Sequence, residues 1–272
     1  MMEDRSGIGK GNRVLLDKLH QLVKGPFTPA DAATLLSVDP GRARRLLNLL
    51  SRHGWLSRVR RGLYVLVPLG ASEPKAWRED PWAVAATAFA PCYVSGWSAC
   101  EHWGLTDQIF SDVVVVSAAS LRHRSVLLQG TMFRLKYAPL VKHFGTRPAW
   151  RGMTRVEVAD PTKAVVDILD DPSLGGGVKH VAEVVDTYFA GEHRSDKTLL
   201  DYVERLGNRT VYKRLGHILE AIGIQAEGVV EVCGKNLSAG LSLLDPTGPK
   251  GGRIQKKWRL RVNVELSRRS PS

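Results

Sequence analysis

The first seventy residues alternate apolar stripes with turn signals, a pattern that predicts three helices and a hairpin. Apolar residues recur at helical spacing over 13–24, where Asn12 is the expected N-cap, and again over 29–36 and 40–53. The next segment, 55–68, places apolar residues on both sides of an Arg-Arg-Gly centre, which is typical of a β-hairpin that turns at its glycine. Two short helices joined by a tight turn and followed by a hairpin indicate a winged helix-turn-helix.

The helix expected over 40–53 has two contrasting faces. Its apolar stripe, which can hold it against the domain, consists of Ala43, Leu46, Leu47 and Leu50. Arginine binds guanine through two hydrogen bonds and asparagine binds adenine, so the opposite face suits the major groove of DNA. We expect base contacts from Arg42, Arg44, Arg45 and Asn48. Further DNA contacts are expected from Thr28 at the preceding helix start and from Arg52, Arg58, Arg60 and Arg61.

Positive charge is concentrated at the two ends of the chain. Residues 1–70 carry 12 Lys and Arg against 5 Asp and Glu, and residues 247–272 carry 8 against 1. The net charge of the whole chain is +12, so the middle is slightly acidic. Localised positive charge favours a polyanionic partner, because neutralised phosphates release their counterions. A helical domain with an incidental solvated basic surface is the alternative, and the order of helices, turn and hairpin favours double-stranded DNA.

The middle of the chain predicts a mixed α+β scaffold domain over 81–172, after a polar linker over 71–80. The pattern predicts helices over 81–90, 95–104 (with Ser95 as the cap) and 160–170, and strands over 93–94, 112–117, 132–137 and 155–159. The fold class expected for the whole chain is therefore α+β.

The middle part contains residues that suggest two kinds of chemistry. Carboxylates near strands and a lysine suggest a metal-dependent nuclease, namely Asp112, Glu157, Asp160 and Lys163. An N-cap followed by proline explains Asp160 more simply. Zinc ligation by Cys92, Cys100 and His102 lacks a fourth ligand at usable spacing, so the cysteines are interpreted as buried apolar residues. We expect no catalytic site, metal or cofactor.

The last third predicts three amphipathic helices over 178–188, 195–206 and 211–222, and then a basic hairpin or edge strand. Together they make a helical C-terminal domain over 178–266. The basic terminal residues fit contact with nucleic acid, contact with an acidic protein, or simple solvation, and they are Arg253, Lys256, Lys257, Arg259 and Arg261.

Membrane and secreted classes do not fit the chain. It has no apolar stretch of the roughly 18–20 residues that a membrane span needs, and no signal-peptide pattern at its N-terminus. Three widely spaced cysteines without a Cys-x-x-Cys pair indicate a reducing cytoplasm.

Five short motifs, taken in order, resemble the AbiEi family, antitoxins of a bacterial toxin–antitoxin system first known from phage abortive infection. They are RGLY at 61–64, YVSGWSA followed by HWGL within 93–105, VADPTKAVVD at 158–167, KRLGHILE at 213–220 and WRLRVN at 258–263. The resemblance spans about residues 13 to 263.

The resemblance implies a winged-helix repressor that binds inverted repeats in its own promoter and is not an enzyme. It also implies a partner toxin of nucleotidyltransferase type, encoded next to it and neutralised with the help of the C-terminal region. The protein is then expected to be a monomer in solution or a dimer on DNA. A stand-alone transcription factor with a sensory domain and a DNA nuclease are the alternatives.

Overall fold

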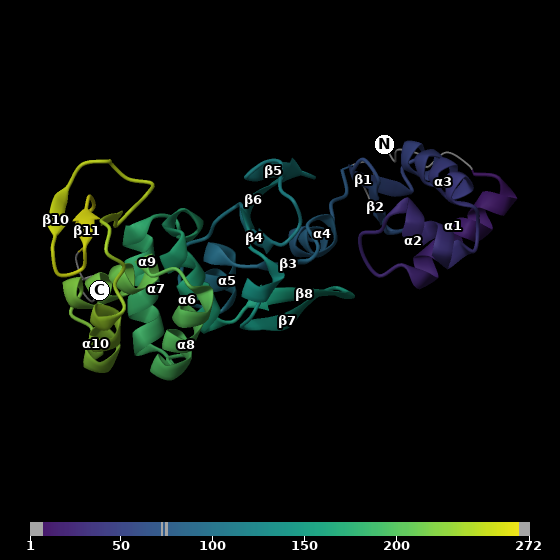
Figure 1. Ribbon diagram of the computed structural model, residues 1–272. Coiled ribbons are helices and arrows are strands. Elements are labelled where there is room, and N and C mark those ends of the chain that lie inside the picture. Colours follow the sequence, from purple (N-terminus) through teal and green to yellow (C-terminus); the bar gives the residue numbers. More distant parts are fainter. Residues whose placement is uncertain (1–7, 72, 74–75, 267–272) are drawn as a thin grey trace.

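The computed structural model describes residues 8–71, 73 and 76–266, and it is a mixed α+β protein, as expected from the sequence (Figure 1). The helix-turn-helix lies at one end, a six-stranded sheet lies in the middle, and most of the remaining helices lie at the other end. Within the described residues, no helix is both long enough and apolar enough to cross a membrane.

The N-terminal elements follow the pattern expected from the sequence. They are α1 (Lys10–Leu22), α2 (Pro29–Leu36), α3 (Pro40–Arg52), β1 (Leu56–Arg60) and β2 (Leu63–Leu66). The first helix begins earlier than predicted: Gly9 is its N-cap, and Asn12 lies inside it. A core of its own holds these elements together, formed by residues such as Leu19, Leu36 and Leu47.

The middle of the chain forms the large sheet, whose strand order is β5-β6-β4-β3-β8-β7. Its strands are β3 (Cys92–Val94), β4 (Val113–Ser117), β5 (Ser125–Leu128), β6 (Thr131–Tyr137), β7 (Thr146–Arg151) and β8 (Thr154–Ala159). The helices before, between and after them are α4 (Pro81–Ala88), α5 (Gly96–His102), η1 (Leu140–Lys142), α6 (Pro161–Asp170) and η2 (Pro172–Gly175). The edge strands β5 and β7 were not predicted.

The C-terminal part is helical and ends in a small basic sheet, in agreement with the predicted class. Its elements are α7 (Val178–Ala190), α8 (Asp196–Leu206), α9 (Thr210–Ala221), α10 (Glu227–Lys235), β9 (Ser242–Leu243), β10 (Arg253–Gln255) and β11 (Leu260–Val262). β10 and β11 form the expected antiparallel hairpin, and β9 adds a parallel strand to it. The helix α10 was not predicted.

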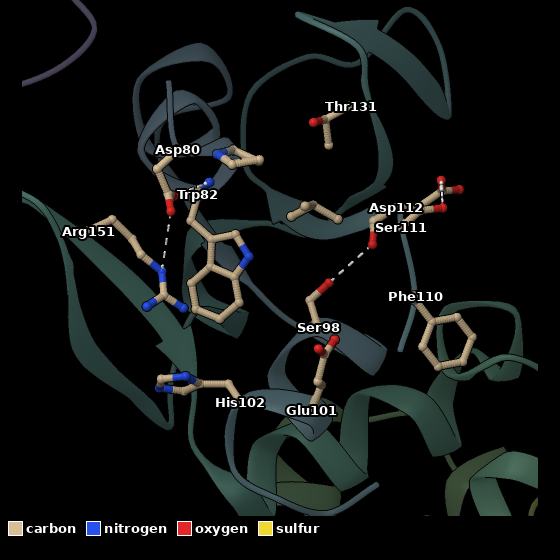
Figure 2. Close-up of a pocket in the computed structure, with 12 residues that line it drawn as sticks. Asp80, Trp82, Ser98, Glu101, His102, Phe110, Ser111, Asp112, Thr131 and Arg151 are labelled. Carbon is tan, nitrogen blue, oxygen red and sulfur yellow. Dashed lines mark hydrogen bonds and ion pairs between the residues drawn. The ribbon is translucent and has the colours of Figure 1, made fainter. Parts of the chain in front are cut away.

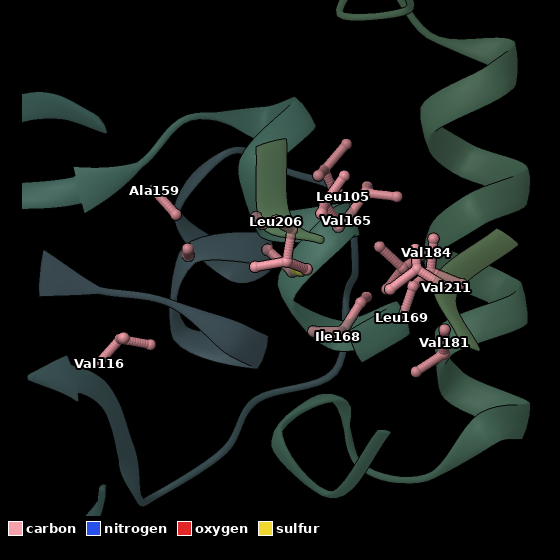
Figure 3. Packing of buried hydrophobic residues seen from close by; sticks show 14 of the residues in the cluster. Leu105, Val116, Ala159, Val165, Ile168, Leu169, Val181, Val184, Leu206 and Val211 are labelled. Carbon is pink, nitrogen blue, oxygen red and sulfur yellow. The ribbon is translucent and has the colours of Figure 1, made fainter. Parts of the chain in front are cut away.

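A second core runs from the large sheet into the C-terminal helices, with α6 at its centre. Figure 3 shows Ile168 and Leu169 of α6 between the sheet and Val181 and Val184 of α7. Every residue of α6 before Asp170 is buried, and these residues include Lys163 and Asp167 as well as the apolar ones. The sheet and the helical bundle are therefore packed on one another through α6.

A polar cluster lies inside this second core. The Lys163 ammonium is fully buried, forms an ion pair with Asp167, and donates to the Tyr93 hydroxyl at 3.0 Å. Ser95 also donates to Asp167, at 2.6 Å, so its hydroxyl does not cap α5 as predicted. Because buried charges must be paired, these contacts explain the polar residues of two motifs as structural.

Candidate nucleic-acid interface

The helix-turn-helix is assembled by local capping. The Thr28 hydroxyl accepts from the Asp31 backbone N–H while the Asp31 carboxylate accepts from the Thr28 N–H, a capping box that begins α2. Ser37 adopts a left-handed conformation at the end of α2, and Asp39 and Pro40 begin α3 two residues later. Thr28, predicted to touch DNA, thus has a clear structural role at the start of α2.

The N-terminus of α3 holds a carboxylate. Asp39 accepts from the Arg42 backbone N–H at 2.8 Å. The backbone N–H groups of Arg42 and Gly41 lower the pKa of Asp39, and the nearby positive charge of Arg45 lowers it further. Asp39 therefore stays ionised and stabilises the first turn of the helix that carries the predicted base readers.

The two faces of α3 separate as its sequence predicts. Ala43, Leu46, Leu47 and Leu50 are buried in the N-terminal core. The predicted base readers are all exposed, and they are Arg42, Arg44, Arg45 and Asn48. None of the three arginines forms an ion pair or a side-chain hydrogen bond with the part of the chain that the structure describes. Long donors thus project freely from a helix that is firmly anchored.

Asn48 is held in place by a buried residue of the hairpin. Tyr64 in β2 is only 4% exposed, and its hydroxyl donates to Asn48 Oδ1 at 2.9 Å. This contact orients the Asn48 amide so that its NH₂ group remains available to a partner. Sequence reasoning missed this role of Tyr64, because the contact joins residues sixteen positions apart on different elements.

The hairpin has the geometry of a wing. β1 and β2 are antiparallel, and Gly62 makes the turn between them with φ +77°. Phe27 extends this sheet by exchanging backbone hydrogen bonds with Tyr64 at 2.9 Å in both directions. Arg58 and Arg61 are exposed on the wing, where positive charge meets phosphates in proteins of this shape.

Arg60, another predicted wing contact, instead reaches the body of the protein. Its guanidinium donates to the Ala88 carbonyl at 2.7 Å, at the end of α4. Val59 and Leu63 of the wing also enter the second core. The wing therefore packs directly against the body, which sets its position relative to the large sheet.

The predicted basic residues of the C-terminal hairpin fall into two groups. Lys257 forms an ion pair with Glu220, and Arg259 donates to the Ser238 carbonyl at 3.1 Å. The other three have no side-chain partner among the described residues, and they are Arg253, Lys256 and Arg261. Trp258 between the groups is fully buried against Gly216, which anchors the hairpin on α9.

The residues that suggest a nuclease site in the sequence have separate roles in the structure. Asp112 forms an ion pair with Arg134, Glu157 forms one with Arg155, and Asp160 caps α6 by accepting from the Lys163 backbone N–H. In the described ranges, no group of three or more His, Cys, Asp or Glu side chains is placed to hold a metal ion.

A hollow of about 400 Å³ lies beside Asp112 (Figure 2). Its lining includes carboxylates and the Arg151 guanidinium. Arg151 lies over the Trp82 ring at 4.2 Å and 3.8 Å from the Asp80 carboxylate. Burial lowers the pKa of His102 at its edge, and the positive charge of Arg151 adds to this effect. His102 is thus held in its neutral form at neutral pH, packed edge-on against Trp82.

Of the two cysteines considered as zinc ligands, Cys100 is buried and Cys92 is half-buried. Burial raises the pKa of the Cys92 thiol to about 12 and moves that of Cys100 in the same direction. Both therefore remain thiols rather than metal-binding thiolates at neutral pH.

Comparison with known proteins agrees with this geometry. Residues 14–67 match the model of a family described as transcriptional regulator, AbiEi antitoxin. The RV2827C protein from Mycobacterium tuberculosis has a similar crystal structure, with a TM-score of 0.64 at 16% sequence identity over 93% of this chain and 92% of that one. That likeness shows a shared fold over nearly the whole chain. No curated protein matches the sequence.

Proposed function

We propose that this protein, whose residues 14–67 are an AbiEi antitoxin transcriptional regulator domain, is a non-enzymatic autorepressor and antitoxin. It binds inverted repeats in its own promoter and neutralises a cognate toxin of nucleotidyltransferase type encoded beside it. The observation that carries the DNA-binding half is α3, with its leucines buried and its arginines exposed and unpaired among the described residues.

The DNA-bound arrangement follows from this helix. α3 enters the major groove, where Arg44, Arg45 and Asn48 read base edges, because residues three and four apart share one side of a helix. Arg42 is a fourth base reader near the start of α3, Arg52 lies toward the phosphates, and Arg58 and Arg61 on the wing contact the neighbouring backbone. Inverted repeats place two copies of the protein on one site, so it acts as a dimer on DNA.

The part of the chain after the winged helix carries the second proposed activity, which is neutralisation of the toxin. The division proposed is a DNA-reading domain up to residue 70, a scaffold over 81–172 and a helical part over 178–266 that engages the toxin. The C-terminal hairpin supports this role with three exposed or half-exposed cations that have no partner among the described residues. A second DNA contact by the same hairpin is the competing assignment.

Repression is tested with a reporter gene under the native promoter. Wild-type protein lowers expression, and the Arg44→Ala/Arg45→Ala double variant restores it. A Lys197→Ala/Arg209→Ala variant, which removes two exposed cations from the helical part, keeps full repression. Repression by the double variant at the wild-type level would contradict the assignment of α3.

Neutralisation is tested by co-expression with the adjacent gene and scoring of growth. Rescue by wild-type protein supports the antitoxin role, and loss of rescue in an Arg253→Ala/Lys256→Ala/Arg261→Ala variant assigns it to the hairpin. Repression without any rescue would instead identify a stand-alone transcription factor.

A further inference from the structure

A hollow of about 800 Å³ lies beside β6. Figure 1 shows β6 next to the edge strand β5 in the large sheet. Strand alternation sends Leu135 into the second core and Arg134 and Lys136 to the opposite face. On that face, Trp97 and Leu174 form an apolar wall of the hollow. Its size lies within the range of small-molecule sites, roughly 300–1,000 Å³.

The charge of this hollow is strongly positive and only partly compensated. Arg134 forms an ion pair with Asp112, and Lys136 forms one with Asp170. The rim is the segment that precedes β5, and its Arg122 and Arg124 are exposed without an ion pair or side-chain hydrogen bond to described residues. Two guanidinium groups of one short loop thus line a concave space whose lining also holds the Asp171 carboxylate, 3.8 Å from the Lys136 ammonium.

An aromatic ring completes the lining. Tyr137, at the end of β6, is 58% exposed and borders the same hollow as the two arginines. Guanidinium groups match phosphate through paired hydrogen bonds, and exposed aromatic rings stack on nucleobases. The lining therefore pairs a phosphate-binding rim with an apolar and aromatic wall.

We infer that this hollow binds a nucleoside di- or triphosphate, with the phosphates on Arg122 and Arg124 and the base against Tyr137. Duplex DNA presents only phosphate and sugar to a surface outside its grooves, so it has no apolar group to place against Trp97 and Leu174. A free nucleotide uses both halves of the lining. This site is separate from α3 and does not depend on the proposed reading of DNA.

The test is isothermal titration calorimetry of the full chain with ATP, GTP, CTP and UTP, and with pyrophosphate and adenosine as partial ligands. At least one triphosphate binds more tightly than either partial ligand. The Arg122→Ala/Arg124→Ala variant loses roughly tenfold or more in affinity, because it removes charge-assisted hydrogen bonds. Tyr137→Ala weakens the triphosphate and leaves pyrophosphate unchanged.

The matched control is Lys197→Ala/Arg209→Ala, which removes equal charge from two exposed positions that do not line the hollow and keeps nucleotide affinity at the wild-type value. Thermal unfolding shows whether each variant is folded. Equal affinity for pyrophosphate and every triphosphate, or no nucleotide binding by folded wild-type protein, would overturn the inference. Loss of promoter affinity in Arg122→Ala/Arg124→Ala without nucleotide binding would assign the rim to DNA and overturn it as well.

Discussion

Replacing Tyr64 by phenylalanine tests whether the core of the winged helix orients its DNA-reading face. The substitution removes only the hydroxyl that donates to Asn48 Oδ1 at 2.9 Å, and the buried ring stays in place. No cavity forms, so the loss of stability is that of one hydrogen bond, about 0.5–1.5 kcal/mol.

The expected loss of DNA affinity follows from the Asn48 side-chain amide, which the Tyr64 hydroxyl no longer orients in this variant. A well-placed Asn–adenine pair is worth about 1–3 kcal/mol of discrimination. An Asn48 amide that rotates freely loses part of this, so Tyr64→Phe lowers affinity for the native promoter by about three- to tenfold, which is about 1 kcal/mol. In an Asn48→Ala background the same substitution changes affinity no further, because no amide remains to be oriented.

Urea unfolding gives the stability and fluorescence polarisation gives the affinity. Tyr202→Phe is the matched control, because the Tyr202 hydroxyl donates to Asp160 at 2.9 Å far from the winged helix. It lowers stability by a similar amount and leaves DNA affinity unchanged. If Tyr64→Phe binds the promoter as tightly as wild type, or if its effect persists without Asn48, the positioning role of Tyr64 is refuted.

Three further substitutions test the stability of the scaffold. Thr28→Ala removes the capping box of α2 and costs about 1 kcal/mol in urea unfolding. Asp167→Asn leaves the Lys163 ammonium buried without a counter-charge and costs about 3–5 kcal/mol in the same assay. Burial raises the pKa of Asp170, but Lys136 and Asn208 outweigh this effect and hold the pKa below its ordinary value. Asp170 therefore stabilises the fold above the ordinary pKa of an aspartate, and this contribution is lost as the pH falls through the lowered pKa. Asp170→Asn therefore flattens the acid side of a stability–pH profile.

Each of these has a result that contradicts it. A Thr28→Ala variant with unchanged stability and weakened DNA binding would return Thr28 to the DNA-contacting residues. Wild-type stability in Asp167→Asn would show that Lys163 finds another partner. An unchanged acid profile in Asp170→Asn would show that its contacts with Lys136 and Asn208 persist in the unfolded chain.

The winged helix could be predicted from sequence because its determinants are local. Caps, prolines and the leucine stripe of α3 lie within a few residues of each other, and the structure places α2 at Pro29–Leu36 as expected. The exposed face of α3 followed from the same periodicity. Caps, prolines and helical periodicity involve residues that are close together in the chain, so one sequence is enough to predict them.

The missed elements depend on contacts that a sequence does not display. β5 and β7 are edge strands whose residues are exposed or half-buried except for Leu128, so they lack the apolar alternation that marks a half-buried strand. Gly228 and Gly234 weaken the helical pattern of α10, which packs on α9. Arg60 and Ser95 were assigned by local rules, whereas distant partners, Ala88 and Asp167, hold their side chains.

The most direct test of α3 as the DNA-reading element is the ratio of two affinities. Fluorescence polarisation compares the native promoter duplex with a scrambled duplex of equal length, at one fixed salt concentration, because phosphate contacts depend on salt. Wild-type protein prefers the promoter strongly. Arg44→Ala/Arg45→Ala loses about 1–3 kcal/mol of that preference for each base-reading arginine and binds both duplexes almost equally. If the folded double variant keeps the wild-type ratio of promoter affinity to scrambled-duplex affinity, α3 is not the element that reads the DNA sequence.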